Sequence, residues 1–299
     1  MMITTFFPRA AISLAFAAGL SACGAHDIAT LKSKSIDQTT FSGAVADKYR
    51  KFVTFEADEM MDWQDAAYFA SKALWVLEDP SAAKPEDFAD WHIEERFIHD
   101  LTVGEARLKV AMRLFDPEEV ADDLASAITS FDCWIEQAEE GWQDDHIAAC
   151  QKAFNDALAA LESSKGVVIS DTGEARTRLV VHHDLDEAEL RAEDLVLVRS
   201  FARRGGSDLR LHVHVTGHAD RAGPEIHNKK LSVSRALALV RAIRSSWPGQ
   251  YTFSIEGLGE ASPIVQTPDG VQEIRNRRTE AEVILSIRPQ FPLIETATR

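Results

Sequence analysis

Residues 211–236 read LHVHVTGHADRAGPEIHNKKLSVSRA, and this stretch decides how the C-terminal half of the chain folds. Val213 and Val215 alternate with polar neighbours, a period-two pattern that predicts a half-buried strand. A polar loop follows. Ser232 stands where a helix N-cap would be useful, so a helix is predicted over 232–246. The stretch is therefore predicted to form a strand, a loop and a helix in that order.

The loop and the first turn of the predicted helix carry two opposite charges, Asp220 and Arg235. Facing one cleft, an aspartate and an arginine suit a zwitterionic ligand. The ligand's carboxylate would gain a forked guanidinium partner and free helix N–H groups, and its ammonium would gain the aspartate. The alternative is that the two side chains only pair with each other and pin the loop.

Several short motifs in a fixed order give this half a resemblance to a known family. They are TGHAD at 216–220, Asn228, Leu231-Ser232, Arg235-Ala236, Gly257-Leu258-Gly259-Glu260, Pro263 and Asn276-Arg277-Arg278. Over roughly residues 175–287 the chain resembles the C-terminal domain of OmpA and the peptidoglycan-associated lipoproteins. The resemblance implies non-covalent binding of peptidoglycan through the diaminopimelate of its stem peptide.

The same resemblance assigns residues to the expected site. Asp220 and Arg235 match the family's two ligand-holding positions. Thr216, Gly217 and Asn228 keep matching positions, where they are expected to shape the loop through backbone contacts.

Other positions are less clear or depart from the family pattern. Arg277 and Arg278 match an arginine pair that either assists the ligand carboxylate or ties the last loop to the sheet. His-His-Asp-Leu-Asp at 182–186 replaces the family's usual motif of the first strand. Ala219 stands where threonine is common, and His227 where tyrosine is common. These departures concern the rim of the expected pocket more than its centre.

The N-terminus has the features of an exported lipoprotein. Residues 1–22 contain an apolar segment too short to span a bilayer, ending in Leu-Ser-Ala before Cys23. This looks like a bacterial lipoprotein cleavage site, which implies lipidation of Cys23 with acyl chains such as palmitate; the alternative is a plain signal peptide. Gly24, in place of aspartate, favours the outer membrane. Residues 23–40 are small and polar and are predicted to form a flexible tether.

Residues 41–165 have helical apolar spacing almost throughout, which predicts an all-α domain. Five helices are expected: two before Asp79-Pro80, a third after Thr102, a fourth from Pro117 and a fifth over about 144–163. This segment holds 28 acidic against 11 basic residues, a net charge of −17, whereas 166–299 holds 18 of each. Such a surface disfavours nucleic acid and could attract a basic partner, although a merely soluble acidic face is the simpler interpretation.

Cys133 and Cys150 are equidistant from a predicted turn at Gly141-Trp142. Residues equidistant from the turn of an antiparallel helical hairpin face one another, and an exported protein meets an oxidising compartment. A disulfide between them is therefore predicted, with two buried free thiols as the alternative. Trp134 and Trp142 are expected to fill the core of this hairpin.

Residues 166–299 are predicted to fold as β-α-β-α-β-β, a mixed sheet with helices on one face. The same fold is implied by the resemblance. With the helical domain before it, the chain is assigned to the α+β class.

Four histidines raise a metal hypothesis. His212 and His214 share a strand face, and His182 or His183 could lie on a neighbouring strand, so three imidazoles could hold zinc and serve a hydrolase. The simpler interpretation is a polar, half-exposed sheet face. The chain contains no GxSxG, no HExxH and no phosphate-binding glycine loop. No enzyme activity, cofactor or metal is therefore expected.

The sequence thus predicts a lipid-anchored outer-membrane protein that faces the periplasm and ties the membrane to peptidoglycan. The alternative is a periplasmic scaffold whose acidic helical domain binds a protein partner, with wall binding serving only to place it. Deleting 41–165 should separate the two, because a tether would still link membrane to wall whereas a scaffold would lose its partner.

Overall fold

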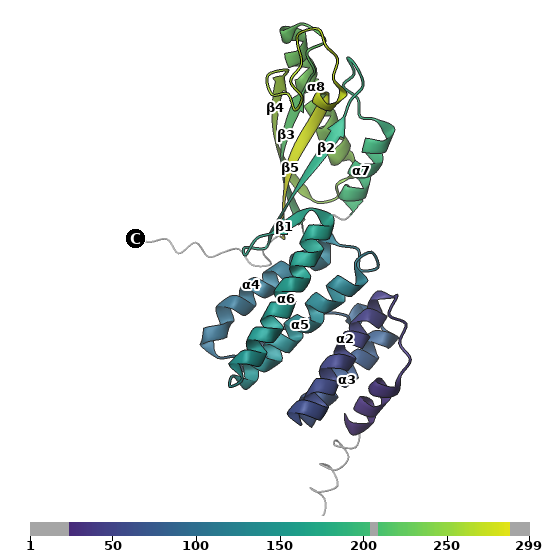
Figure 1. Ribbon diagram of the computed structural model, residues 1–299, viewed down its shortest axis with the longest axis vertical. Coiled ribbons are helices and arrows are strands. Elements are labelled where there is room, and N and C mark those ends of the chain that lie inside the picture. Colours follow the sequence, from purple (N-terminus) through teal and green to yellow (C-terminus); the bar gives the residue numbers. More distant parts are fainter. Residues whose placement is uncertain (1–23, 204–208, 288–299) are drawn as a thin grey trace, which may run out of the picture. The chain divides into compact units, whose positions relative to one another are not determined.

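The computed structural model describes residues 24–203 and 209–287. The chain forms two compact units (Figure 1). The helical unit comprises Met1–Leu101 and Pro117–Leu158, and the α+β unit comprises Thr102–Asp116 and Ala159–Arg299. No helix among the described residues is long and apolar enough to cross a membrane.

Five long helices dominate the N-terminal half. They are α2 (Phe41–Phe55), α3 (Trp63–Glu78), α4 (Glu95–Leu114), α5 (Ala121–Glu140) and α6 (Asp144–Lys165), with a π-helical turn η1 at Glu56–Met60 and 3-10 turns η2 at Pro80–Ala82 and η3 at Phe88–Asp90. Side-chain caps fix two starts: the Thr40 hydroxyl accepts from Gly43 N, and the Asp62 carboxylate accepts from Gln64 N and Asp65 N. The five predicted helices are confirmed, but α4 begins at Glu95, before the expected start after Thr102.

The expected tether differs from the structure. Cys23 lies outside the described residues, but residues 24–33 form a helix, with Ile28 and Leu31 buried. These two apolar residues are three apart and therefore share one helix face. Such a short apolar stripe is hard to distinguish from a linker in the sequence, because its burial depends on packing against the rest of the unit.

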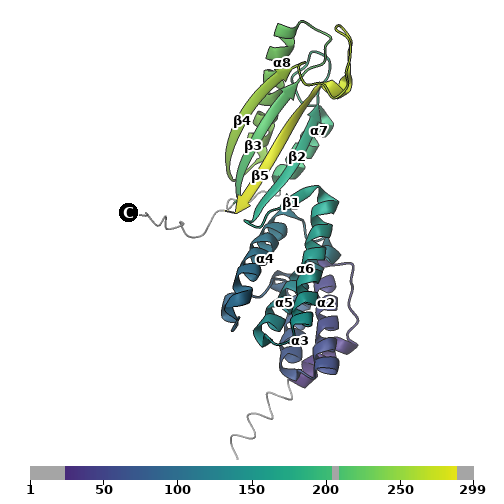
Figure 2. The same cartoon turned by 60° about the vertical axis from the view of Figure 1, so that its left-hand side comes forward.

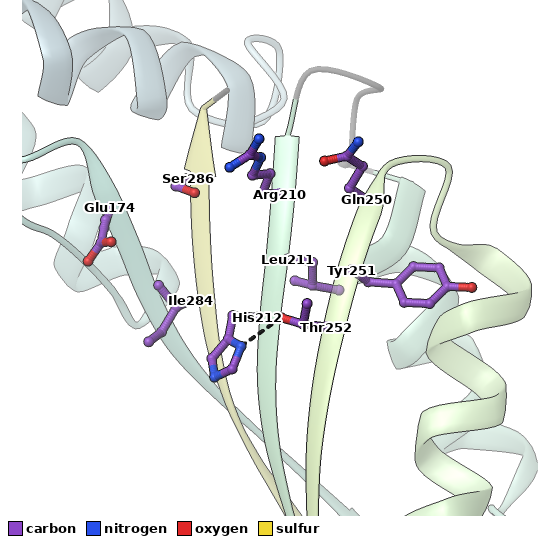
Figure 3. A pocket seen from close by; sticks show the side chains of 9 residues that line it. All are labelled: Glu174, Arg210, Leu211, His212, Gln250, Tyr251, Thr252, Ile284 and Ser286. Atoms are coloured by element: carbon purple, nitrogen blue, oxygen red, sulfur yellow. Dashed lines mark hydrogen bonds between the residues drawn. The ribbon is translucent and has the colours of Figure 1, made fainter. Parts of the chain in front are cut away.

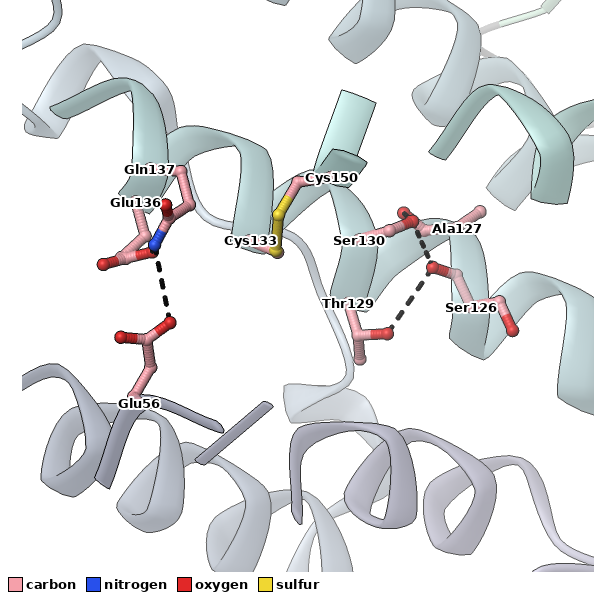
Figure 4. The surroundings of a disulfide bond; sticks show 9 residues. All are labelled: Glu56, Ser126, Ala127, Thr129, Ser130, Cys133, Glu136, Gln137 and Cys150. Atoms are coloured by element: carbon pink, nitrogen blue, oxygen red, sulfur yellow. Dashed lines mark hydrogen bonds between the residues drawn. A yellow bond between two sulfur atoms is a disulfide. The ribbon is translucent and has the colours of Figure 1, made fainter. Parts of the chain in front are cut away.

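The predicted disulfide is present. Cys133 of α5 and Cys150 of α6 are joined, with their Cα atoms 5.7 Å apart (Figure 4). The helices turn where expected, at Gly141, whose φ of 72° ends α5 in the left-handed conformation. Trp134 is buried, but the prediction for Trp142 was wrong, since 71% of it is exposed in the loop after the Gly141 cap.

The α+β unit contains one mixed sheet. Its elements are β1 (Val167–Ile169), β2 (Glu174–His182), α7 (Ala192–Arg203), β3 (Leu209–His218), α8 (Glu225–Ser246), β4 (Gln250–Gly259), the 3-10 turn η4 (Ile274–Asn276) and β5 (Arg278–Ile287). The strand order is β1-β2-β5-β3-β4; β3 and β4 are parallel, and β5 runs antiparallel to both β2 and β3. The predicted β-α-β-α-β-β order and α+β class are confirmed, with β1 as a short addition.

The alternation along β3 explains the layers. Leu211, Val213 and Val215 are buried, whereas His212 and His214 point to the opposite face. The helices α7 and α8 lie on one side of the sheet, as Figure 2 shows, and leave the histidine face uncovered by helices of this unit.

The start of α8 was predicted wrongly. The helix begins at Glu225, after Pro224, and not at Ser232. Ser232 therefore lies inside the helix, where its hydroxyl donates to Lys229 O (2.8 Å) and accepts from Gly259 N (2.8 Å). Apart from Ile226 and the buried Asn228, residues 225–230 of α8 are polar and exposed, so the apolar spacing begins well after the helix does.

Candidate functional site

Three loops converge at one end of the sheet. They follow β2 (183–191), follow β3 (219–224) and connect β4 to β5 (260–277). Because β5 is antiparallel to β2 and β3, its start lies beside the ends of these two strands. Main-chain bonds join the loops, from His183 N to Arg277 O (2.9 Å) and from Gly270 N to Arg221 O (2.6 Å). The residues singled out in the sequence are carried mainly by these loops and by α8.

Arg235 is the largest fully buried side chain of the protein's described part, with 0% of it exposed. Its guanidinium donates to three main-chain carbonyls: Glu187 O (2.8 Å), His218 O (2.9 Å) and Asp184 O (3.0 Å). Burial lowers its pKa to about 10, and nearby Asp220 opposes that effect, so Arg235 remains charged at neutral pH. Arg235 thus holds the loop after β2 against the end of β3.

Asp220 is also buried, and its partner is Arg277. The Asp220 carboxylate accepts from Arg277 Nη1 (2.9 Å), from Glu273 N (3.0 Å) and, more weakly, from Ala222 N (3.4 Å). Arg277 also donates to His183 O (3.3 Å). The alternative in which Asp220 and Arg235 form an ion pair with each other is not what the structure shows. Asp220 pairs with Arg277 instead.

Asn228 connects the two ends of the loop after β3. Its amide nitrogen lies within hydrogen-bond distance of Asp220 O (2.9 Å), Gly223 O (3.0 Å) and the Glu260 carboxylate (2.5 Å). It therefore holds the segment that carries Asp220 close to the first turn of α8.

Gly217 and Thr216 differ in their relation to this cluster. A Cβ atom on Gly217 would lie 1.9 Å from Ser232 O, so only glycine lets the end of β3 approach α8 this closely. The Thr216 hydroxyl instead lies 3.3 Å from His214 Nε2 on the open face of the sheet. The structure therefore brings Gly217, but not the Thr216 side chain, to the cluster.

The two adjacent arginines point to different partners. Whereas Arg277 bonds Asp220, Arg278 donates to Glu280 Oε1 (2.6 Å) and to Ser262 O (3.3 Å). Neighbouring residues at the start of a strand face opposite sides, which separates their roles. Arg278 ties the loop after β4 to β5.

The histidines do not converge. The strand β5 separates β2 from β3, so His182 is not on a strand next to His212 and His214. Those two rings bond hydroxyls of β4, Thr252 Oγ1 (2.7 Å) and Ser254 Oγ (2.8 Å). Within residues 24–203 and 209–287, no group of three or more His, Cys, Asp or Glu side chains is placed to hold a metal ion.

His183 has a structural environment. One ring nitrogen lies 3.1 Å from Glu189 O and the other 2.8 Å from Thr279 Oγ1, and burial lowers its pKa to about 4. A neutral imidazole here fixes the loop after β2 beside the start of β5.

Two glutamates of the cluster were not assigned a role from the sequence. Glu260 accepts from Asn228, and Glu273 supplies the main-chain N–H that bonds Asp220 while its side chain caps η4 at Arg275 N (3.1 Å). Glu260 belongs to the Gly-Leu-Gly-Glu motif and could have been found from it. A main-chain donor such as Glu273 N leaves no side-chain signal in the sequence.

Together these contacts define an α+β domain with a buried charge cluster at the loop end of its sheet. No protein-family model matches the chain. The chain is 26% identical over 187 residues to outer membrane protein A of Bordetella avium. This match covers 59% of this chain and 95% of that protein. It is 28% identical over 108 residues to outer membrane porin F of Pseudomonas fluorescens, where the match covers 36% of this chain and only 33% of the porin.

Solved structures that match part of this chain include three from bacteria. The peptidoglycan-associated lipoprotein of Burkholderia pseudomallei is 20% identical, with a match over 35% of this chain and 88% of that chain and a TM-score of 0.28. The OmpA-like domain of FopA1 from Francisella tularensis is 19% identical, over 42% and 82% of the two chains, with a TM-score of 0.31. The cell wall anchor of the T6SS from Pseudomonas aeruginosa is 23% identical, over 44% and 94%, with a TM-score of 0.28.

Proposed function

We propose that the α+β unit binds peptidoglycan non-covalently, and that a lipidated Cys23 holds the protein at the periplasmic side of the outer membrane. The observation that carries the first part is the clustering of Asp220, Arg235 and Arg277 at the loop end of the sheet. The motifs that contain these residues resemble those of peptidoglycan-binding OmpA-like domains. The anchor rests on the sequence around Cys23, which lies outside the described residues.

The ligand chemistry follows from the two charges. The free end of diaminopimelate carries a carboxylate and an ammonium on one carbon, which suit Arg235 and Asp220 respectively. A guanidinium has five N–H donors, and three of those of Arg235 bond carbonyls within the described residues. Two donors remain for a ligand carboxylate.

Access requires movement of a loop. Asp220 is 4% exposed and Arg235 is not exposed at all, so a ligand cannot reach both in this conformation. Two of the carbonyls on Arg235 belong to the loop after β2, at Asp184 and Glu187. In the proposal this loop opens, and the ligand carboxylate takes the place of one or both carbonyls.

The test is co-sedimentation of the purified full chain with sacculi. Asp220→Asn and Arg235→Lys remove one charge or the guanidinium fork with little change of volume. Removing one partner of a desolvated charge pair typically weakens binding by about 2–5 kcal/mol. Each variant should therefore bind sacculi at least about thirtyfold more weakly. Asp144→Asn and Arg176→Lys are matched controls, because both side chains are largely exposed and lie outside the three loops of the site. The circular dichroism and unfolding midpoint of each variant should be recorded alongside.

Competition with the unmodified protein gives a second readout that does not depend on folding of a variant. Added diaminopimelate should release the protein from sacculi, whereas lysine, which lacks the second carboxylate, should release little. If folded Asp220→Asn and Arg235→Lys proteins bind like the parent, and diaminopimelate does not compete, the cluster is purely structural.

A further inference from the structure

The edge strand β4 combines an open main chain with apolar side chains. Among the described strands it pairs only with β3. Residues 250–252 and 254–256 are exposed, and Phe253 is half-buried. The sequence QYTFSIE contains neither lysine nor proline, the residues that commonly protect such edges. An edge of this kind can accept a further strand.

An apolar surface lies beside this edge. We name it the edge patch; it consists of Val233 and Leu237 of α8 and of Tyr251, Phe253 and Ile255 of β4. The three β4 residues are level with Leu211, Val213 and Val215 of β3, so they lie on the helix-covered face of the sheet. On that face α8 leaves them partly uncovered.

Contacts along α8 place Val233 and Leu237 next to β4. A Cβ atom on Gly257 would lie 2.5 Å from Val233 Cγ2, and at the other end Arg244 Nε donates to the Tyr251 hydroxyl (3.3 Å). The helix therefore runs opposite to the strand. Leu237 lies about 6 Å along the axis from Val233, which brings it level with Ile255. Figure 3 shows Tyr251 extending from the outer side of β4.

Four of the five residues of the edge patch are substantially exposed, Val233 by 38%, Leu237 by 40%, Tyr251 by 37% and Ile255 by 41%, and Phe253 is half-buried. Contiguous exposed apolar surface of this kind is typical of an interaction site.

We propose that β4 pairs antiparallel with β4 of a second copy of this chain, about a two-fold axis at Phe253. The two sheets would then form one continuous sheet, and the two edge patches would meet on its helix-covered side. This inference goes beyond wall binding, since the edge patch shares no residue with the Asp220 cluster.

The sequence of β4 is self-complementary in this register. Tyr251 would face Ile255 of the second copy, and Thr252 would face Ser254. Aromatic with β-branched residues, and hydroxyl with hydroxyl, are both favourable cross-strand pairs. The only charged residue of the paired segment, Glu256, would face Gln250, so no like charges oppose each other. An isologous contact of this form closes as a dimer and leaves no further edge of its kind.

The net charge of residues 166–299 does not oppose a second copy as the occupant of this edge. Residues 166–299 carry 18 acidic and 18 basic residues, so no net charge of this half opposes self-association. The segment 41–165 carries a net charge of −17 and repels its copy at long range. Added salt screens that repulsion, so the dimer should become more stable as ionic strength rises.

The first test is sedimentation velocity of the purified full chain over a range of micromolar concentrations. The parent should show a concentration-dependent dimer. Ile255→Lys places a charge on the edge and should weaken association at least about tenfold. Val196→Lys on α7 is the matched control, because Val196 is also exposed and lies away from β4. It should dimerise like the parent.

The second test reads the register. Phe253→Cys should form a disulfide-linked dimer on mild oxidation, because position 253 would face itself across the two-fold axis. Thr252→Cys, one residue away, should cross-link far less. A parent that remains monomeric at all concentrations overturns the proposal, and so does a dimer that Ile255→Lys leaves unchanged. A dimer in which Thr252→Cys cross-links as readily as Phe253→Cys overturns the register.

Discussion

At the scale of single residues, two buried arginines stabilise the loop end of the sheet in different ways. Among the residues that the structure describes, Arg235 bonds main-chain carbonyls, whereas Arg277 forms an ion pair with Asp220 and bonds His183 O. A main-chain carbonyl accepts a hydrogen bond from the guanidinium but does not neutralise its charge. A carboxylate accepts the hydrogen bond and also neutralises the charge. The two arginines should therefore respond differently to substitution.

Arg277→Ala should destabilise the α+β unit strongly, because it leaves the Asp220 carboxylate buried without its cation. Breaking a buried ion pair from one side typically costs about 3–5 kcal/mol. Arg275→Ala is the control: Arg275 pairs with Glu273, its side chain is 64% exposed, and such pairs contribute about 0–1 kcal/mol. Urea denaturation followed by the circular dichroism of the full chain should separate the two. Equal midpoints for both variants would show that the Asp220–Arg277 pair adds nothing.

The sequence could predict several of the residues that gather at this site, although not that the Thr216 and Arg278 side chains point elsewhere, and it could not predict how the residues are paired. The motif order brought Asp220, Arg235 and Arg277 together correctly. Their partners are mostly main-chain atoms, such as Glu187 O and Glu273 N, and any residue type supplies these. The pairing of a charge with the backbone depends on loop conformation, which leaves no residue-specific pattern.

At the scale of secondary-structure elements, the contact between η1 and α5 contains buried carboxyl groups. The Gln137 amide donates to Glu136 (2.9 Å) and lies 3.5 Å from Glu56 of the π-helical turn (Figure 4). Both glutamates are almost fully buried. Burial raises the pKa of Glu136 to about 9 and that of Glu56 to about 8, and each is raised further by negative neighbours, Glu56 for Glu136 and Glu140 for Glu56.

This contact predicts that the helical unit loses stability as pH rises. The folded pKa of Glu136 lies above its ordinary value of 4.5, so the folded state binds more protons between pH 4.5 and about 9. The stabilisation is fully present below pH 4.5 and is lost as pH rises through about 9. Glu136→Gln keeps the shape without the charge, so it should raise stability at pH 9 by about 1–3 kcal/mol and change it little near pH 4.5.

Denaturant unfolding of the disulfide-intact protein, followed by tryptophan fluorescence at several pH values, measures this effect. Glu139→Gln is the control on the same helix, since Glu139 is exposed. The idea fails if the parent and Glu136→Gln lose stability in parallel from acid to alkaline pH.

Element boundaries show which sequence signals were strong. The end of α3 before Asp79-Pro80 and the α5–α6 disulfide were predicted correctly, because proline and paired cysteines act through local covalent constraints. The start of α8 was missed because Pro224 caps it without a side-chain hydrogen bond. Burial of Glu56 and Glu136 was missed as well, since an acidic residue in a polar helix ordinarily faces solvent.

At the scale of the whole molecule, the two units are interleaved along the chain. The α+β unit includes Thr102–Asp116 as well as the end of α6. Arg107 and Glu162 form an ion pair there (3.1 Å), and the same carboxylate oxygen of Glu162 accepts from Ile169 N (3.2 Å). A deletion of 41–165 would remove these contacts and damage the unit proposed to bind the wall. Tests of tethering should therefore use point variants of the full chain.

The proposed attachment to the membrane through Cys23 and the proposed attachment to the wall through the Asp220 cluster should be lost independently of each other. Removing the sulfur that would carry the acyl chains, by Cys23→Ser, should release the protein from the membrane fraction or leave the signal peptide uncleaved, while folded protein still binds sacculi. Asp220→Asn should have the opposite effect: the protein should remain in the membrane fraction and no longer bind sacculi. Because membrane anchoring and wall binding are proposed to use different residues, the double variant should show both losses without further change. Fractionation of cells that express each variant, with purified sacculi added to the soluble and membrane fractions, measures all four states. Unchanged detergent-phase partitioning of Cys23→Ser would contradict the anchor alone, whereas sacculus binding by folded Asp220→Asn would contradict the proposed wall contact alone.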